Sequence, residues 1–436
     1  MKVFNKKFNS DELDINEIIE VLRLQQAPFK TKTQDHVSSI LEEVFTRGDE
    51  AIKEFSLEFD GLNISSLDEA RIDSKLISNS KSLVDKETFI SLKKTYKRIL
   101  NYQKTLLPSE KIDNNIIRKN IPIESILIYT PGGKALYPST VLMAAGPAKA
   151  AGVRNIILTS PSPTKSLSPI ILAACHVAGI DEVYCIGGVH AIGGFVFRNN
   201  SLPNVDKVVG PGNKYVAEAK RQIFGMAGID LIAGPSEILV IGDNQTDPYS
   251  TALDLMAQAE HDEQACSILV SLDQEFTNKV ESIINNEVET LERKDIIKKS
   301  LLDNGFIINL NTIEEAIDFS NKFAPEHLHL KLKDSSRIMD KFIYAGTILI
   351  GDDSANAISD YSLGPSHILP TSASARFSSQ LSVNNFLVHP TVINLNKEEL
   401  KGNYLDLLED TITLSKAEGL SAHAKSAVYR LKKLKG

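Results

Sequence analysis

The sequence predicts an α/β protein with parallel sheets. From about residue 123 onwards, short and nearly continuous apolar runs alternate with helical stretches, and the runs form two groups along the chain. Such runs are typical of strands that helices cover on both faces, with right-handed crossovers between them. We therefore expect two α/β domains, with small helical segments at both ends of the chain.

The expected elements follow in chain order. Before residue 123 we expect mostly helix, because apolar residues recur at three- and four-residue spacing in 16–23, 37–45 and 86–104. The first group of strands is expected at 125–130, 155–159, 182–186 and 207–209, and the second at 237–242, 267–271, 305–310, 327–332 and 345–350. Residues 397–436 return to a charged helical pattern that often packs on a neighbouring domain or subunit.

Composition indicates a globular protein with a small-molecule partner. The chain has 436 residues, 42% hydrophobic and 24% charged, which is enough for a large core and more than one domain. Its net charge of −8 argues against a nucleic-acid or anionic-membrane surface. The N-terminus lacks a signal-peptide pattern and no apolar run could span a bilayer, so we expect a cytoplasmic protein. Three cysteines without CxxC spacing are expected as buried thiols: Cys175, Cys185 and Cys266.

Glycines cluster where the first group of strands ends, at 131–133, 187–188 and 210–213. Ligands of open parallel sheets bind at this edge, and glycine lets the backbone approach a phosphate closely. A nucleotide site is one interpretation. Tight strand-to-helix turns are the other, because no Gly-x-Gly-x-x-Gly is present.

Four short segments hold most of the candidate metal and proton-transfer residues: Gln258–His261, Pro325–His327, Asp360 and Glu418–His423. Imidazole nitrogen and carboxylate oxygen suit Zn²⁺, and a catalytic zinc keeps part of its coordination open. The pattern suggests a zinc-dependent enzyme. Each segment also has an ordinary explanation, since Gln258 and His261 fit a partly exposed face of a helix at 252–262, and Asp360 fits a turn or helix cap.

Glu326 and His327 are adjacent after a proline and begin a predicted strand. An adjacent acid and base can serve two proton transfers, although a regular strand would point the two side chains to opposite faces. His329 fits an ordinary strand position. The remaining histidines with no informative neighbours are expected to be structural: His36, His176 and His389.

The chain resembles the histidinol dehydrogenase family over nearly its whole length. Six segments carry the resemblance, in order: Tyr129–Gly133, Val209–Val216, Gly228–Glu237, Ala257–His261, Phe323–His327 and Glu418–Ala424. The resemblance implies oxidation of L-histidinol to L-histidine through L-histidinal, with two NAD⁺ in succession, as the last two steps of histidine biosynthesis. It implies Zn²⁺ as the metal.

The resemblance also implies roles for individual residues. His327 would remove protons during hydride transfer, and Glu326 would activate the water that adds to the aldehyde. The zinc ligands would be Gln258, His261, Asp360 and His423. Substrate would contact Ser236, Gln258, His261, His327, Asp360, His367, Glu418 and His423. NAD would contact Tyr129, His190 and Asn213.

The fold implied by the family is a homodimer of chains with two incomplete Rossmann-like domains. Residues 25–128 and 237–385 would form the domain with zinc and catalytic residues, and 129–236 would form the domain with the NAD contacts. Residues 1–24 would be an N-terminal segment, and 386–436 would complete the partner subunit's site with Glu418 and His423.

The sequence departs from the family pattern at a few positions. His190 replaces a glutamine, and imidazole offers fewer hydrogen bonds than an amide, so cofactor affinity is expected to change. Ser359 and Ser366 replace a glycine and an asparagine around Asp360 and His367. Two alternatives stay open: a related zinc and NAD dehydrogenase of another small alcohol, and a non-catalytic zinc- or nucleotide-binding relative.

Overall fold

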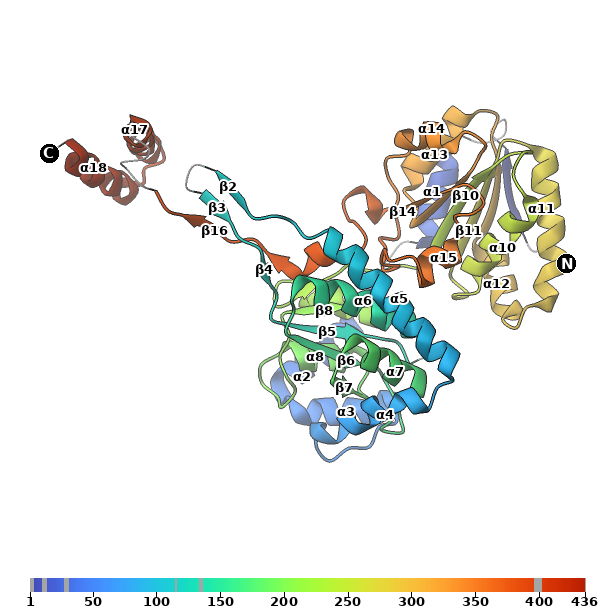
Figure 1. The fold of residues 1–436 in the computed structure, drawn as a ribbon, viewed down its shortest axis with the longest axis horizontal. Coiled ribbons are helices and arrows are strands. Elements are labelled where there is room, and N and C mark those ends of the chain that lie inside the picture. Colours follow the sequence, from blue (N-terminus) through green and yellow to red (C-terminus); the bar gives the residue numbers. More distant parts are fainter. Residues whose placement is uncertain are drawn as a thin grey trace. The chain divides into compact units, whose positions relative to one another are not determined.

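The computed structural model of the chain describes residues 4–9, 14–26, 31–113, 116–132, 136–395 and 402–435. Its contacts separate two units, one of Met1–Leu107 with Pro122–Phe386 and one of Pro108–Ile121 with Leu387–Gly436. The first unit contains two parallel sheets with helices between the strands (Figure 1), so the predicted α/β class is confirmed. None of the described helices combines the length and apolar character that a bilayer span requires.

The first sheet has six parallel strands in the order β1-β12-β11-β10-β13-β14. The second predicted group of strands is present as β10 (Glu237–Gly242), β11 (Cys266–Ser271), β12 (Gly305–Asn309), β13 (His327–Lys331) and β14 (Thr347–Ile350). β1 (Lys6–Asn9) lies in the stretch that we expected to be mostly helical. It has only 4 residues, too few to show a period, and it forms by pairing with β12.

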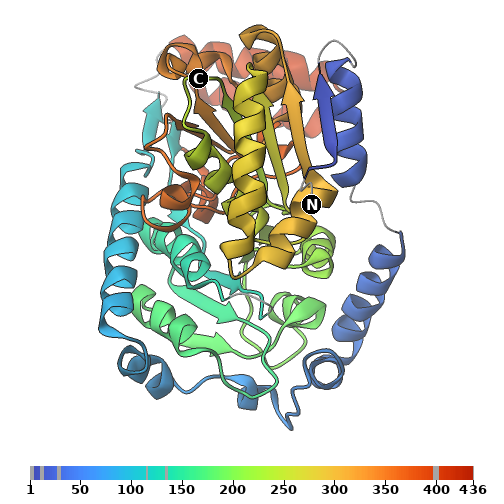
Figure 2. The ribbon, with the colours of Figure 1, turned by 90° about the vertical axis from the view of Figure 1, so that its right-hand side faces the viewer.

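Successive residues of a strand point to opposite faces of the sheet. Both faces of this sheet carry buried apolar residues, and helices cover both of them. Val240 packs in a buried cluster with residues of α10 (Pro248–Ala259), α11 (Gln274–Glu287) and α12 (Lys294–Asn304). Leu239 packs in another with residues of α1 (Ile15–Gln26) and α13 (Ile313–Phe323). Figure 2 shows α11, in yellow, in front of the sheet. The short helices α14 (Ser335–Ile338) and α15 (Asn356–Tyr361) flank β14 in sequence.

The second sheet has five parallel strands in the order β7-β6-β5-β8-β9. Four of them are the first predicted group: β5 (Ser125–Tyr129), β6 (Asn155–Thr159), β7 (Glu182–Tyr184) and β8 (Lys207–Val209). The edge strand is β9 (Gly228–Ile229). The helices that follow the first four strands are α6 (Pro138–Ala151), α7 (Pro169–Ala178), α8 (Gly188–Val196) and α9 (Lys214–Ile223).

The N-terminal helices contact this second sheet's helices. α2 (Thr31–Arg47) and α3 (Asp49–Asp60) contact α8, α4 (Ser74–Asn79) contacts α7, and α5 (Lys86–Thr105) contacts α6. The predicted division grouped residues 25–128 with the other sheet. Val44 and Ile52 instead join the cluster that contains Leu127 of β5. Periodicity identifies the apolar face of a helix, but it does not say which sheet that face covers.

The second unit combines a small antiparallel sheet with a helical hairpin. Its sheet consists of β2 (Lys111–Asp113), β3 (Ile116–Arg118) and β16 (Thr391–Ile393), and its helices are α17 (Gly402–Ala417) and α18 (Ser421–Lys435). The chain segments at the boundary form the short strands β4 (Ile121–Pro122) and β15 (Leu387–Val388).

Candidate active site

The candidate acid and base lie at the amino end of β13. Phe323 ends α13, Ala324 has a left-handed φ of 51°, and Pro325 and Glu326 lead to His327, the first residue of the strand. Oε2 of Glu326 is 3.7 Å from Nδ1 of His327. The two side chains therefore approach each other rather than pointing to opposite faces, because regular strand geometry begins only at His327.

Each ring nitrogen of His327 has a partner. Nδ1 lies 3.1 Å from the backbone carbonyl oxygen of Glu237, which can only accept, so Nδ1 carries a proton. Nε2 lies 3.3 Å from Oδ1 of Asp360. Burial lowers the pKa of His327, but the charge of Glu326 and the hydrogen bond with Asp360 outweigh it and raise the pKa well above its usual value. Because the Glu237 carbonyl occupies Nδ1, Nε2 is the nitrogen that can exchange a proton with a substrate, as a donor when the ring is charged and as an acceptor when it is neutral.

A second buried carboxyl group, that of Glu237 at the start of β10, contacts Glu326. The backbone N–H of Glu237 donates to Oε2 of Glu326 at 2.6 Å. The carboxyl group of Glu237 accepts from the backbone N–H groups of Glu326, at 3.3 Å, and Ser372, at 2.9 Å. Burial, and next the charge of Glu326, raise the pKa of Glu237 to about 8. The sequence alone assigned Glu237 no role, because a glutamate that follows Gly-Pro-Ser has no distinguishing pattern.

The first two candidate ligands lie at the end of α10. The helix ends at Ala259 rather than at 262, so Gln258 is in its last turn and His261 lies beyond it. Nδ1 of His261 is 3.2 Å from the carbonyl oxygen of Gln258 and donates to it, which leaves the lone pair of Nε2 for a metal. Gln258 is buried, and its Oε1 accepts from Nδ2 of Asn356 at 2.8 Å.

Asp360, the third candidate ligand, lies in the last turn of the short helix α15 and is buried. His367 supports it: Nδ1 of His367 donates to the carbonyl oxygen of Asp360 at 2.8 Å, and Nε2 accepts from Oγ1 of Thr140 at 3.1 Å. Burial lowers the pKa of His367 despite the charge of Asp360, so the ring is neutral. In this arrangement His367 holds the backbone of Asp360. Ser236, the remaining predicted substrate contact of the first unit, directly precedes β10 and is half-buried.

The donors fit a divalent cation. An amide oxygen, an imidazole nitrogen and a carboxylate come from Gln258, His261 and Asp360, and Asp360 interacts electrostatically with His261. Asn356 contacts Gln258 through its Nδ2, and its own Oδ1 is buried without a hydrogen-bond partner. A cation held by Gln258 would give this oxygen a positively charged neighbour. Within the described part of the chain, no group of three or more His, Cys, Asp or Glu side chains is placed to hold a metal ion. The predicted ligand set includes the amide of Gln258 and His423 of the second unit. Only His261 and Asp360 of the first unit therefore count toward such a group.

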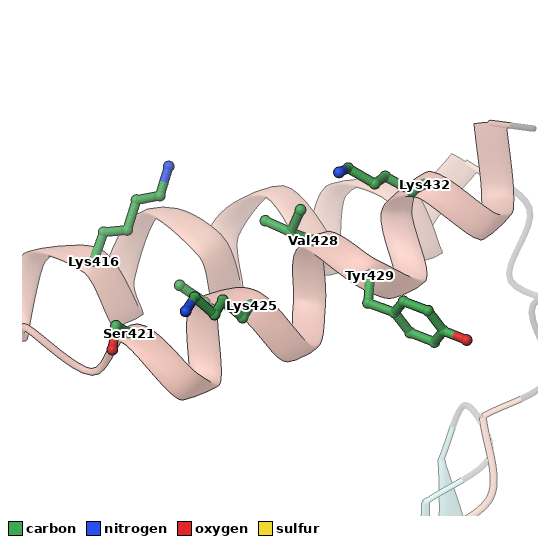
Figure 3. Close-up of a pocket in the computed structure, with 7 residues that line it drawn as sticks. Lys416, Ser421, Lys425, Val428, Tyr429 and Lys432 are labelled. Atoms are coloured by element: carbon green, nitrogen blue, oxygen red, sulfur yellow. The ribbon is translucent and has the colours of Figure 1, made fainter.

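The remaining two predicted metal and substrate contacts, Glu418 and His423, belong to the second unit. Glu418 follows α17, His423 lies in the first turn of α18, and both are exposed. A groove of about 410 Å³ runs between these helices (Figure 3) and is lined by Lys416, Ser421, Ala424, Lys425, Val428, Tyr429 and Lys432. The groove is basic and includes neither Glu418 nor His423.

The glycine-rich edge of the five-stranded sheet is closely packed. A Cβ atom at Gly132 would lie 2.3 Å from the carbonyl oxygen of Pro161, and one at Gly187 would lie 2.2 Å from a side-chain carbon of the same proline. The hydroxyl of Tyr129 accepts from the backbone N–H of Gly188 at 3.1 Å. These glycines thus have a packing reason of their own, in addition to any nucleotide.

The other two predicted NAD residues differ in exposure. Asn213 is exposed and caps α9 by accepting from the N–H groups of Tyr215 and Val216. His190 has 0% exposure, its ring packs against Phe55 and Phe59, and no hydrogen bond reaches either ring nitrogen. The imidazole would contact a cofactor only after moving.

A buried polar cluster lies further along β13, on the face that carries His327. Oδ2 of Asp254 in α10 is 2.7 Å from Nζ of Lys331 and 3.3 Å from Nδ1 of His329. Nε2 of His329 donates to the carbonyl oxygen of Gly351 at 2.8 Å, because a carbonyl can only accept. The cluster connects the elements that hold the candidate base and ligands. In β13 polar residues alternate with leucines, at His327, His329 and Lys331. This alternation is a sequence signal for a buried polar cluster, and the sequence analysis did not use it.

Comparisons with known proteins give this site its family context. The histidinol dehydrogenase family profile matches residues 24–431. Histidinol dehydrogenase of Gluconobacter oxydans (strain 621H) is 40% identical over 434 residues, which cover 98% of this chain and 100% of that protein. That of Pseudomonas putida (strain KT2440) is 38% identical over 430 residues, with 98% and 97% covered. The crystal structure of histidinol dehydrogenase from Elizabethkingia anophelis matches with a TM-score of 0.91 and 30% identity, and each chain is covered over 100% of its length.

The parallel α/β fold, its buried acid–base cluster and these matches define the class: the protein is an oxidoreductase. The family profile spans most of the chain, and the relatives match over nearly their full length. The chain belongs to the histidinol dehydrogenase family.

Proposed function

We propose that this protein oxidises L-histidinol to L-histidine through L-histidinal, with NAD⁺ as acceptor in two successive steps and Zn²⁺ as the metal. The proposal rests above all on the pair of Glu326 and His327, whose side chains lie 3.7 Å apart and are both buried beside Asp360. Membership of the histidinol dehydrogenase family supports the substrate.

The residues of the chain divide the proton transfers between them. When bound, NAD⁺ accepts hydride and Zn²⁺ orients the substrate. In its neutral form His327 takes the hydroxyl proton of the alcohol at Nε2, since Nδ1 keeps its own proton in the hydrogen bond to the carbonyl of Glu237. Water then adds to the aldehyde carbon, and Glu326 takes a proton from that water. Alcohol, water and two NAD⁺ become carboxylic acid, two NADH and two protons.

We also propose that the protein acts as a cytoplasmic homodimer in which Glu418 and His423 of one subunit complete the other subunit's site. The second unit exposes Leu407, Leu414, Leu420 and Tyr429. A unit this small buries little apolar surface by itself and gains stability by docking. The three free cysteines are buried, as suits a reducing compartment.

The test is the yield of NADH from limiting L-histidinol with zinc-loaded protein. We expect two NADH per substrate, loss of activity on chelation and recovery with Zn²⁺. One NADH per substrate would indicate an alcohol dehydrogenase that stops at the aldehyde. No NADH would favour a different substrate or a binding role.

A further inference from the structure

Glu237 contacts both candidate catalytic residues. Its backbone carbonyl accepts from Nδ1 of His327, and its backbone N–H donates to Oε2 of Glu326. Its carboxyl group accepts from the backbone N–H of Glu326 in return. Glu237 is fully buried, with 0% exposure, so these bonds do not compete with water.

The carboxyl group of Glu237 also holds a strained loop. Ser372 and Ala373 have left-handed φ values of 54° and 62°, and the N–H of Ser372 donates to Oε1 of Glu237 at 2.9 Å. Such non-glycine conformations cost on the order of 1 kcal/mol or more each and persist only where surrounding groups fix them. The neighbouring Thr371 is fixed as well, because its Oγ1 accepts from the N–H of Gly234 at 2.6 Å.

We propose that Glu237 is a positioning residue for the aldehyde-oxidising step and acts through Glu326. Its backbone N–H fixes Oε2 of Glu326, and its side chain fixes the Glu326 backbone, so that Oε1 of Glu326 is directed at the attacking water. In this step the water oxygen bonds to the aldehyde carbon, Glu326 takes a proton from the water and returns it to the former carbonyl oxygen, and the product is the aldehyde hydrate. The inference rests on the proposed function.

Burial and the charge of Glu326 raise the pKa of Glu237 to about 8, so Glu237 is mostly protonated at neutral pH. A neutral Glu237 does not compete with Glu326 as the base, and its two oxygens still accept from backbone N–H groups. The contact with His327 involves the carbonyl oxygen of Glu237 rather than its side chain. A side-chain variant should therefore affect the aldehyde step and spare the alcohol step.

The test measures the two steps separately in the zinc-loaded protein. NADH from L-histidinol in the presence of semicarbazide, which traps the aldehyde, reports the first step, and NADH from added L-histidinal reports the second. Glu237→Gln keeps size and neutrality but turns one acceptor toward a backbone N–H into a donor. We expect the second step to slow about tenfold or more and the first by less than about threefold.

A double-mutant comparison tests whether Glu237 acts through Glu326. Glu326→Gln should slow the second step selectively, and adding Glu237→Gln to it should change that rate by less than about twofold. Val240→Ala, a cavity-forming change on the same buried strand, is the control and should change both steps by the same factor. If Glu237→Gln does not fold, Glu237→Asp, whose shorter side chain cannot keep both N–H contacts, should give the same selective loss.

Equal slowing of both steps by the Glu237 variants, or no slowing, would overturn the positioning role. So would a further large loss in the double variant. The proposed function fails separately, and only if the wild-type protein does not form two NADH per L-histidinol.

Discussion

Nε2 of His327 lies 3.3 Å from Oδ1 of Asp360, so a candidate proton acceptor touches a candidate metal ligand. β13 and α15 bring them together across 33 residues of chain. Proton transfer and metal binding are therefore adjacent in this site. An informative variant must disturb one of them and leave the other measurable.

Replacement of the candidate base should stop turnover and leave metal binding intact. We expect His327→Asn to lower kcat by about a hundredfold or more, because a general base contributes this much, with unchanged zinc content. His176→Asn is the matched control, since His176 lies in α7 and packs on Phe89. Retained turnover in His327→Asn would exclude the assigned role.

Asn356 should support the metal through Gln258. Its Nδ2 donates to Oε1 of Gln258, the atom with which a glutamine binds a metal, and so orients that ligand. We expect Asn356→Ala to weaken zinc binding about tenfold to a hundredfold, measured by competition with a chelator. Ile358→Ala, at an exposed position of the same helix, should leave the affinity unchanged. Equal affinities for all three proteins would show that Gln258 needs no such support.

Strand positions could be predicted because burial on both faces leaves an unbroken apolar run, as in β10 and β11. The site could not be assembled in this way, because its contacts join residues distant in sequence. Asn356 meets Gln258 across 98 positions and Glu326 meets Glu237 across 89, and no local pattern encodes either contact. The family resemblance supplied the ligands and the acid–base pair, whereas these supporting residues emerged only from the folded chain.

Subunit mixing should test whether His423 acts across the dimer. In a mixture of His327→Asn and His423→Asn proteins after subunit exchange, a heterodimer has one site with both histidines intact. Random exchange makes about half of the dimers mixed, so about a quarter of wild-type activity should return. Wild-type protein mixed with His327→Asn is the control, because its activity should stay the same before and after exchange. No recovery after verified exchange would place His423 in the site of its own chain.

Asp254 should stabilise the fold in a pH-dependent way. Burial raises the pKa of Asp254, but hydrogen bonds from His329 and Lys331 outweigh it, and the net shift is downward. A lowered folded-state pKa gives stability that is fully present above the unfolded value of about 3.9 and is lost as pH falls through the folded value. At pH 7 we expect Asp254→Asn to lower the free energy of unfolding by about 2 kcal/mol, because the buried Lys331 loses its nearer carboxylate and keeps that of Asp352, at 3.3 Å. Denaturant titrations should show this difference shrinking below about pH 4, while the exposed Asp353→Asn changes stability little at any pH. A difference that stays constant with pH would mean that packing, rather than the charge of Asp254, stabilises this cluster.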